Sequence, residues 1–392
     1  MSTFTPSPNA VAKAEQLMAG AEQQTGLRDW GTADFVEPMQ VLLDGMLNEA
    51  QLTERALEQN LLRVRNLLCN RLLLRRDRVE NPAIADEEIV RPIFIMGLPR
   101  SGTTHLHTLM AQDPDSRSPL QWEMMMPSPP PERATYDTDP RIDAVNKNLE
   151  ERGLMTDEMR AIHPFHACLP EECSNIFEHS FLALNFSATM PLPTYRKYRE
   201  QADYRPVYEY HRQFLQHLQW RCPGKRWVLK APEHLLHLDA LLEVYPDAIV
   251  IQTHRDPRKV MPSNLDLVVS LSKYSTTRDD VADLLRDECL SNWSHGADKT
   301  LHLRHNADID SHCVDVFFND IVGKPLDTLE YIYGRTGIPF TAELKARINH
   351  FLHNDRDSKH GKHDYSIEAM GLELEEIDRR FANYVHAFNV PQ

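Results

Sequence analysis

Two stretches of the sequence carry residues that could bind anions. The first, at residues 97–104, reads Gly-Leu-Pro-Arg-Ser-Gly-Thr-Thr, with two glycines five positions apart, one cation at Arg100 and three hydroxyls. In a glycine-bearing turn between a strand and a helix, the backbone N–H groups converge on an anion, and the helix dipole adds a favourable field. The pattern therefore predicts an anion site, which we call the phosphate loop (residues 97–104). The alternative interpretation is an ordinary strand–turn–helix that binds no ligand.

The phosphate loop departs from the nucleoside triphosphate pattern at one position. That pattern places Lys and then Ser or Thr directly after the second glycine. Here Thr103 stands at the Lys position, and Thr104 holds the hydroxyl position. Because the Lys normally reaches the terminal phosphates, the loop favours an anionic group other than ATP or GTP with magnesium.

The second stretch is centred on Arg255, at the carboxyl end of a predicted strand over residues 248–253. Ser263 follows eight residues later in a predicted helix, and a guanidinium with a hydroxyl suits a phosphate monoester. In parallel sheets, ligands bind outside the carboxyl ends of the strands. A surface pair of Arg255 with Asp256 is the alternative. The triplet His254-Arg-Asp256 also occurs in kinase catalytic loops, but no Asp-Phe-Gly follows, which excludes that interpretation.

The two stretches together resemble the nucleotide-binding motifs of sulfotransferases that use 3′-phosphoadenosine 5′-phosphosulfate (PAPS). Residues 99–104 resemble the 5′-phosphosulfate loop, and Arg255 with Ser263 resembles the 3′-phosphate motif. Arg at position 100 is similar to the bacterial and tyrosylprotein-sulfotransferase-like branch, since the cytosolic branch has Lys there. The resemblance covers residues 91–275, and more loosely extends to residue 372. It implies PAPS as donor, 3′,5′-adenosine bisphosphate as product, and cofactor binding by Arg100, Ser101, Gly102, Thr103, Thr104, His105, Arg255 and Ser263.

Sulfuryl transfer needs positively charged side chains that stabilise the leaving oxygen, and a general base. Negative charge grows on the bridging oxygen, and Arg100 and Lys230 are candidates to stabilise it. Lys230 ends a predicted strand, and the resemblance gives a Lys at this place a transition-state role; a surface Lys is the alternative. For the base we favour Glu123, which lies 23 residues after Arg100, near the catalytic Glu of the tyrosylprotein-type branch. The cytosolic branch uses a His, which leaves His163 and His166 open. The chemistry requires no metal.

The elements that must position these residues alternate along the chain. Short apolar runs predict strands at residues 93–96, 227–230, 248–253 and 314–318, with helical patterns between and after them. Alternation of this kind predicts an α/β fold, a P-loop NTPase-like parallel sheet flanked by helices. We divide the chain into an N-terminal helical segment, residues 1–90, and a sulfotransferase-like P-loop α/β domain with a helical C-terminal region, residues 91–392.

Composition limits the partners. A net charge of −15 argues against nucleic acid or an anionic membrane as a general partner. The six cysteines are scattered without a CxxC pair, which predicts reduced thiols in the cytoplasm. No run of 18 apolar residues predicts a transmembrane helix. We expect a sulfotransferase acting on a hydroxyl or amine of a small-molecule or lipid-like acceptor, with a homodimer left open. The alternatives are a nucleotide-binding phosphotransferase and a catalytically idle P-loop binding protein.

Overall fold

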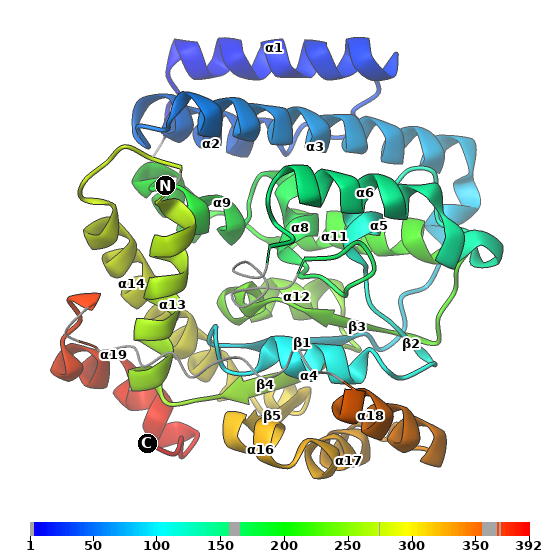
Figure 1. Cartoon of the computed structure of the whole chain (residues 1–392), viewed down its shortest axis with the longest axis vertical. Helices are drawn as coiled ribbons and strands as arrows, with labels where there is room; N and C mark the ends of the chain where they lie inside the picture. Colours follow the sequence, from blue (N-terminus) through cyan, green and yellow to red (C-terminus); the bar gives the residue numbers. More distant parts are fainter. Residues whose placement is uncertain (1–3, 157–164, 274, 355–366, 368–369) are drawn as a thin grey trace.

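A five-stranded parallel sheet forms the centre of the computed structural model (Figure 1), which describes residues 4–156, 165–273, 275–354, 367 and 370–392. The strands lie in the order β2-β3-β1-β4-β5, and each neighbouring pair is parallel. Their bounds are β1 Ile93–Gly97, β2 Ser116–Arg117, β3 Arg226–Lys230, β4 Ile249–His254 and β5 Cys313–Phe317. The predicted α/β fold with a parallel sheet flanked by helices is confirmed.

Alternating side chains of β1 show why both faces of the sheet are covered. Ile93 and Ile95 point into one apolar cluster, together with residues of α4 (Thr103–Met110), α17 (Pro325–Thr336) and α18 (Ala342–Asn354). Phe94 and Met96 point into a second cluster, with residues of α11 (Arg205–Gln219) and α12 (Leu238–Val244). Because successive strand residues face opposite sides, a strand that is apolar throughout must be buried on both.

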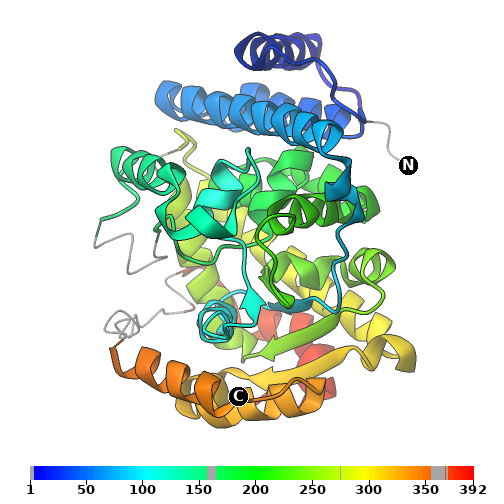
Figure 2. The same cartoon turned by 90° about the vertical axis from the view of Figure 1, so that its right-hand side faces the viewer.

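Helices make up most of the described residues 4–90. These are α1 Pro8–Thr25, α2 Val36–Asn48, α3 Glu54–Glu80 and the short 3₁₀-helix η1 Pro82–Asp86. Ser7 and Thr53 cap α1 and α3 by accepting the N–H groups of Ala10 and Ala56. The views in Figures 1 and 2 place α1 outermost, above α2 and α3. Residues of these helices belong to the same apolar cluster as Phe94, so this segment shares its core with one face of the sheet.

The remaining helices surround the sheet and the phosphate loop. They are α5 Gln121–Met125, η2 Arg133–Thr138, α6 Pro140–Glu151, α8 Ser174–Phe177, η3 Glu178–Ser180, α9 Leu184–Thr189, α10 Pro193–Gln201, η4 Pro232–Leu236, α13 Pro257–Ser272, α14 Val281–Arg304, α15 Ala307–Asp310, α16 Phe318–Gly323 and α19 Leu374–Ala387. The stretch after β3 forms two helices, η4 and α12, which are separated at His237. The proline-rich stretch after α4 forms only the five-residue α5, as its prolines required.

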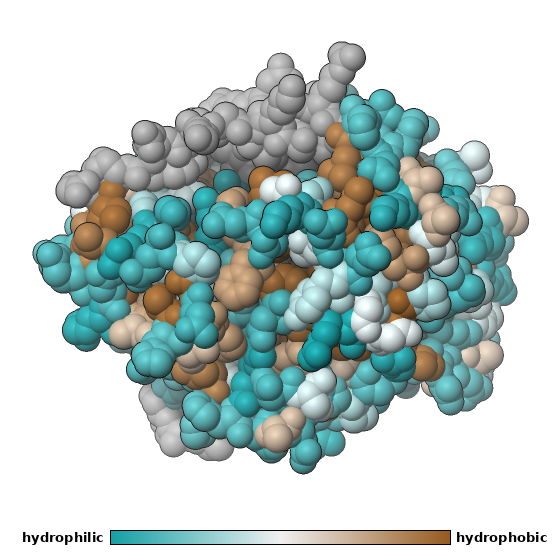
Figure 3. All heavy atoms as spheres, turned by 90° about the horizontal axis from the view of Figure 1, so that it is seen from below, coloured by the Kyte–Doolittle hydropathy of each residue, from teal (hydrophilic) through white to brown (hydrophobic). Residues whose placement is uncertain are grey.

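The surface is largely polar on the side seen in Figure 3. Hydrophilic side chains cover most of this face, with apolar ones scattered among them. Exposed apolar residues on α16 and α17 include Val322 and Tyr331. Within the described ranges, none of the helices combines the length and the apolarity that a bilayer crossing requires.

Candidate active site

The phosphate loop has a backbone that glycine makes possible. It connects β1 to α4, and three of its residues have positive φ: 152° at Gly97, 61° at Arg100 and 91° at Gly102. A Cβ at position 97 would lie 2.3 Å from Oγ1 of Thr253 on the neighbouring strand β4. Position 97 therefore accepts only glycine without a shift of the loop or of β4.

The loop hydroxyls have different surroundings. The Ser101 side chain is fully buried, hydrogen-bonded to the carbonyl oxygen of Leu98 and, at 2.6 Å, to Oγ1 of Thr253. Its hydroxyl therefore supports the loop conformation. Thr103 is also buried, whereas Thr104 is exposed at the start of α4. Of the predicted binding hydroxyls in the loop, that of Thr104 is the one placed on an open surface.

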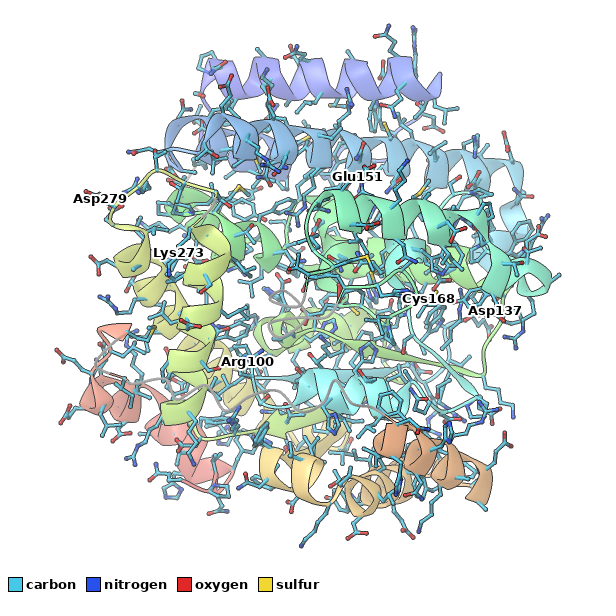
Figure 4. The ribbon with its side chains drawn as sticks, viewed as in Figure 1. Arg100, Asp137, Glu151, Cys168, Lys273 and Asp279 are labelled. Carbon is cyan, nitrogen blue, oxygen red and sulfur yellow. The ribbon has the colours of Figure 1, made fainter. Side chains whose placement is uncertain are left out.

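The two predicted anion motifs meet at Arg100. Its Nε donates to Oγ of Ser263 on α13 at 3.3 Å, and its carbonyl oxygen accepts from Nη1 of Arg255 at 2.5 Å. Figure 4 shows Arg100 between the start of α4 and α13. The Arg255 guanidinium lies 3.8 Å from the centre of the Phe318 ring, and its Nε is buried without a hydrogen-bond partner among the described residues. Burial, and then the charge of Arg100, lower the pKa of Arg255.

Lys230 links the loop to an unpredicted carboxylate. It ends β3, which is the neighbour of β1 opposite to β4, so its side chain emerges at the same edge of the sheet as the loop. Its Nζ donates to Oγ1 of Thr104 at 3.3 Å and forms an ion pair with Glu172. The Lys230 side chain is 1% exposed and that of Glu172 is 25% exposed. A buried ammonium, a loop hydroxyl and a partly exposed carboxylate therefore lie in contact.

Glu123 has a different environment from the one expected of a base. Its side chain is fully buried and forms an ion pair with Arg117 on β2. The other carboxylate oxygen accepts from the backbone N–H of Leu120 at 2.9 Å, which closes the first turn of α5. Both oxygens are occupied and neither reaches solvent, so this geometry argues against our prediction that Glu123 takes a proton from an acceptor.

Only one of the two histidines named as alternative bases lies within the described residues. His163 lies outside the described residues. His166 is exposed and accepts from the backbone N–H of Cys168 at 3.1 Å. Among the residues that the structure describes, no group of three or more His, Cys, Asp or Glu could hold a metal ion.

Comparison with known proteins identifies the family. A sequence model of the sulfotransferase family matches residues 92–342. The chain is a member of the sulfotransferase family. This sulfotransferase is 31% identical to STF1 of Mycobacterium tuberculosis H37Rv, a solved structure, with a TM-score of 0.84 over 94% of this chain and 98% of that one. STF9 of Mycobacterium avium gives a TM-score of 0.88 at 28% identity, over 100% and 98% of the two chains.

A curated relative adds an acceptor name. The sulfotransferase is 26% identical over 305 residues to the omega-hydroxy-beta-dihydromenaquinone-9 sulfotransferase Stf3 of Mycobacterium bovis, which spans 75% of this chain and 74% of the relative. These comparisons favour the sulfotransferase hypothesis over the phosphotransferase and over the idle binding protein. Sulfuryl transfer from an activated donor is therefore the established chemistry of this chain's family.

Sequence reasoning missed the position of Glu172. No sequence motif assigned a role to Glu172. Glu172 precedes the four-residue α8 and meets Lys230 from 58 positions away in the chain. Nothing in the local pattern predicts that pairing.

Proposed function

We propose that this sulfotransferase takes its sulfuryl group from PAPS. The observation that carries the proposal is the meeting of the two anion motifs, in which Arg100 contacts both Ser263 and Arg255. A donor with two separate phosphate groups needs two cation-bearing sites at one edge of the sheet. The buried Nε of Arg255, which has no partner among the described residues, fits a phosphate oxygen as its missing acceptor.

The phosphate loop would hold the phosphosulfate end of the donor. Its backbone N–H groups and the start of α4 suit an anion, and Thr104 presents an exposed hydroxyl there. Arg255 and Ser263 would hold the 3′-phosphate, as the sulfotransferase resemblance implies. Because the Ser101 hydroxyl is turned inward, Ser101 would contact the donor through its backbone N–H.

We propose Glu172 as the general base and Lys230 as the cation beside the leaving oxygen. Sulfuryl transfer forms a bond between the acceptor oxygen and sulfur, breaks the bond between sulfur and the bridging oxygen, and releases one proton from the acceptor. Glu172 is partly exposed, so it can meet an acceptor hydroxyl, and its partner Lys230 also contacts the loop through Thr104. When Lys230 turns to the donor, the carboxylate of Glu172 is free to take the proton.

The acceptor that we propose is a hydroxyl of a lipid-like molecule. The name of the relative Stf3 specifies a hydroxylated menaquinone derivative, and this supports an apolar acceptor for a chain that aligns with it over 305 residues. We place the activity in the cytoplasm, because the six cysteines are free thiols and five of them are buried.

The test is turnover of the purified protein with PAPS and a hydroxylated lipid quinone, followed as release of 3′,5′-adenosine bisphosphate. Glu172→Gln keeps the shape of the side chain but removes its basic oxygen. We expect it to lower kcat by about 10²–10⁴-fold while calorimetric affinity for 3′,5′-adenosine bisphosphate barely changes. Normal turnover by Glu172→Gln would exclude this base, and absence of nucleotide binding by the wild-type protein would exclude the donor.

A further inference from the structure

The segment that carries Glu172 is fixed to the strand end that carries Lys230. The backbone N–H of Cys173 donates to the carbonyl oxygen of Lys230 at 2.9 Å. The hydroxyl of Ser174 donates to Oε2 of Glu233 at 3.1 Å. Both residues that follow Glu172 are therefore bonded to the chain that continues from β3.

Glu233 lies at a junction of several segments. Its side chain is fully buried, and Oε1 accepts from the backbone N–H of Leu184 at 2.9 Å. The Tyr204 hydroxyl lies 3.4 Å from the same oxygen, and Nη1 of Arg199 lies 3.8 Å from it. The two carboxylate oxygens thus have separate tasks: Oε1 binds the segments around α9 and α10, and Oε2 binds Ser174.

The surroundings of Glu233 indicate that burying this carboxylate in its charged form is energetically unfavourable. Burial raises its pKa to about 7, against the opposing effects of Arg199 and of the hydrogen bonds from Ser174 and Leu184. A buried charge contributes little net stability, because desolvation offsets most of what its partners provide. A role in fixing geometry accounts for a carboxylate at this place better than a role in stability does.

We propose that Glu233 is a positioning residue for sulfuryl transfer, which acts through Ser174 to fix Glu172 against Lys230. Glu233 follows Lys230 by three residues and Ser174 follows Glu172 by two. The bond between Glu233 and Ser174 therefore closes a short ring that includes the ion pair of Glu172 with Lys230. This inference rests on the proposed function, in which Glu172 is the base.

The experiment is a double-mutant cycle. Ser174→Ala removes only the bond to Oε2 and leaves the contacts of Oε1 in place. We expect it to lower kcat by about 10–100-fold, since a small misplacement of a reacting group has effects of that size. Affinity for 3′,5′-adenosine bisphosphate should stay within about twofold, because the Ser174 hydroxyl is bonded to Glu233 and not to Arg100 or Arg255. In a Glu172→Gln background, Ser174→Ala should cause no further loss of kcat. Glu233→Gln should behave in the same way.

The control is Asp77→Asn. Asp77 is another buried carboxylate that accepts from a serine, Oγ of Ser128 at 2.6 Å, but it lies on α3. Its effect on kcat should be the same in the wild-type and Glu172→Gln backgrounds. If Ser174→Ala lowers kcat by the same factor in both backgrounds, or leaves kcat unchanged while Glu172→Gln abolishes turnover, the positioning role is wrong and the base assignment stands. Full turnover by Glu172→Gln would overturn both.

Discussion

Arg255 donates from Nη1 to the backbone carbonyl oxygen of Arg100 at 2.5 Å, so the second anion motif is bonded directly to the phosphate loop. Arg100 in turn has positive φ and reaches Ser263 through its side chain. The positive charge of Arg100 adds to burial in lowering the pKa of Arg255, so the two guanidinium groups repel each other. We propose that the anionic donor binds beside both arginines, where it would offset this repulsion.

The first prediction concerns Arg255→Ala. Loss of a guanidinium from a desolvated phosphate should weaken binding of 3′,5′-adenosine bisphosphate by about 2–4 kcal/mol. Ser263→Ala should have a smaller effect, because it removes a neutral hydroxyl. Isothermal titration calorimetry measures both. An unchanged dissociation constant for Arg255→Ala would remove Arg255 from the nucleotide site.

The second prediction concerns the choice of nucleotide. With Arg255 and Ser263 added to the phosphate loop, the protein should bind 3′,5′-adenosine bisphosphate far more tightly than AMP, and magnesium should not be needed. Because Thr103 replaces the Lys that binds the terminal phosphates of ATP, ATP with magnesium should bind much more weakly than 3′,5′-adenosine bisphosphate. Competition titrations against one fluorescent nucleotide give all three constants. Equal affinities for the bisphosphate and AMP would contradict the two-site arrangement.

Local sequence patterns predicted the strands and the helix around the proposed site. β1, the glycine-bearing loop and α4 follow one another without a gap, and an apolar run with two spaced glycines marks them in any context. The strands that lead to Lys230 and Arg255 were also predicted, because both are short apolar runs. Strands β3, β1 and β4 are adjacent in the sheet, so the loop, Lys230 and Arg255 lie at the same end of the strands. Local sequence patterns do not reveal this strand order.

The parts that depend on distant partners were not predicted. Glu123 and Glu172 are both acidic residues beside apolar ones, and nothing local separates them. Their surroundings differ, because Glu123 pairs with Arg117 and is fully buried, whereas Glu172 pairs with Lys230 and is partly exposed. The two-residue strand β2 places Arg117, and it is too short to leave a periodic pattern. The partner of a carboxylate depends on the tertiary structure, so sequence spacing alone could not show that Glu123 is buried against Arg117.

The third prediction concerns Glu123→Gln. It should leave the Arg117 guanidinium buried without a counter-charge and lower the free energy of unfolding by about 3–5 kcal/mol. Arg117 would keep its bonds to the carbonyl oxygens of Leu218 and Cys222, so the protein should still fold at low temperature. Urea unfolding gives the change in stability.

A double variant provides the control for this pair. Arg117→Met combined with Glu123→Leu removes both charges, and it should be less destabilised than Glu123→Gln alone. If Glu123→Gln instead keeps wild-type stability and lowers kcat by more than about 100-fold, the base role returns to Glu123.

The last prediction concerns stability in acid. Burial lowers the pKa of His107, His179 and His211 to about 3 in each case, from the usual 6.5. The folded protein therefore binds fewer protons than the unfolded chain between pH 6.5 and 3, and each histidine should lower the free energy of unfolding by about 1.4 kcal/mol per pH unit as the pH falls through that window. Glu233 acts in the opposite direction, since its raised pKa of about 7 favours the folded state on acidification from 7 to 4.5. Urea unfolding at pH 7.5, 6.0 and 5.0 should show a net loss in the free energy of unfolding, because the histidines outnumber this glutamate.

His211→Gln should make the free energy of unfolding depend less steeply on pH, by the contribution of one histidine, because burial alone lowers the pKa of His211. A stability that stays constant from pH 7.5 to 5.0 in the wild-type protein would mean that these histidines are not buried in their neutral form.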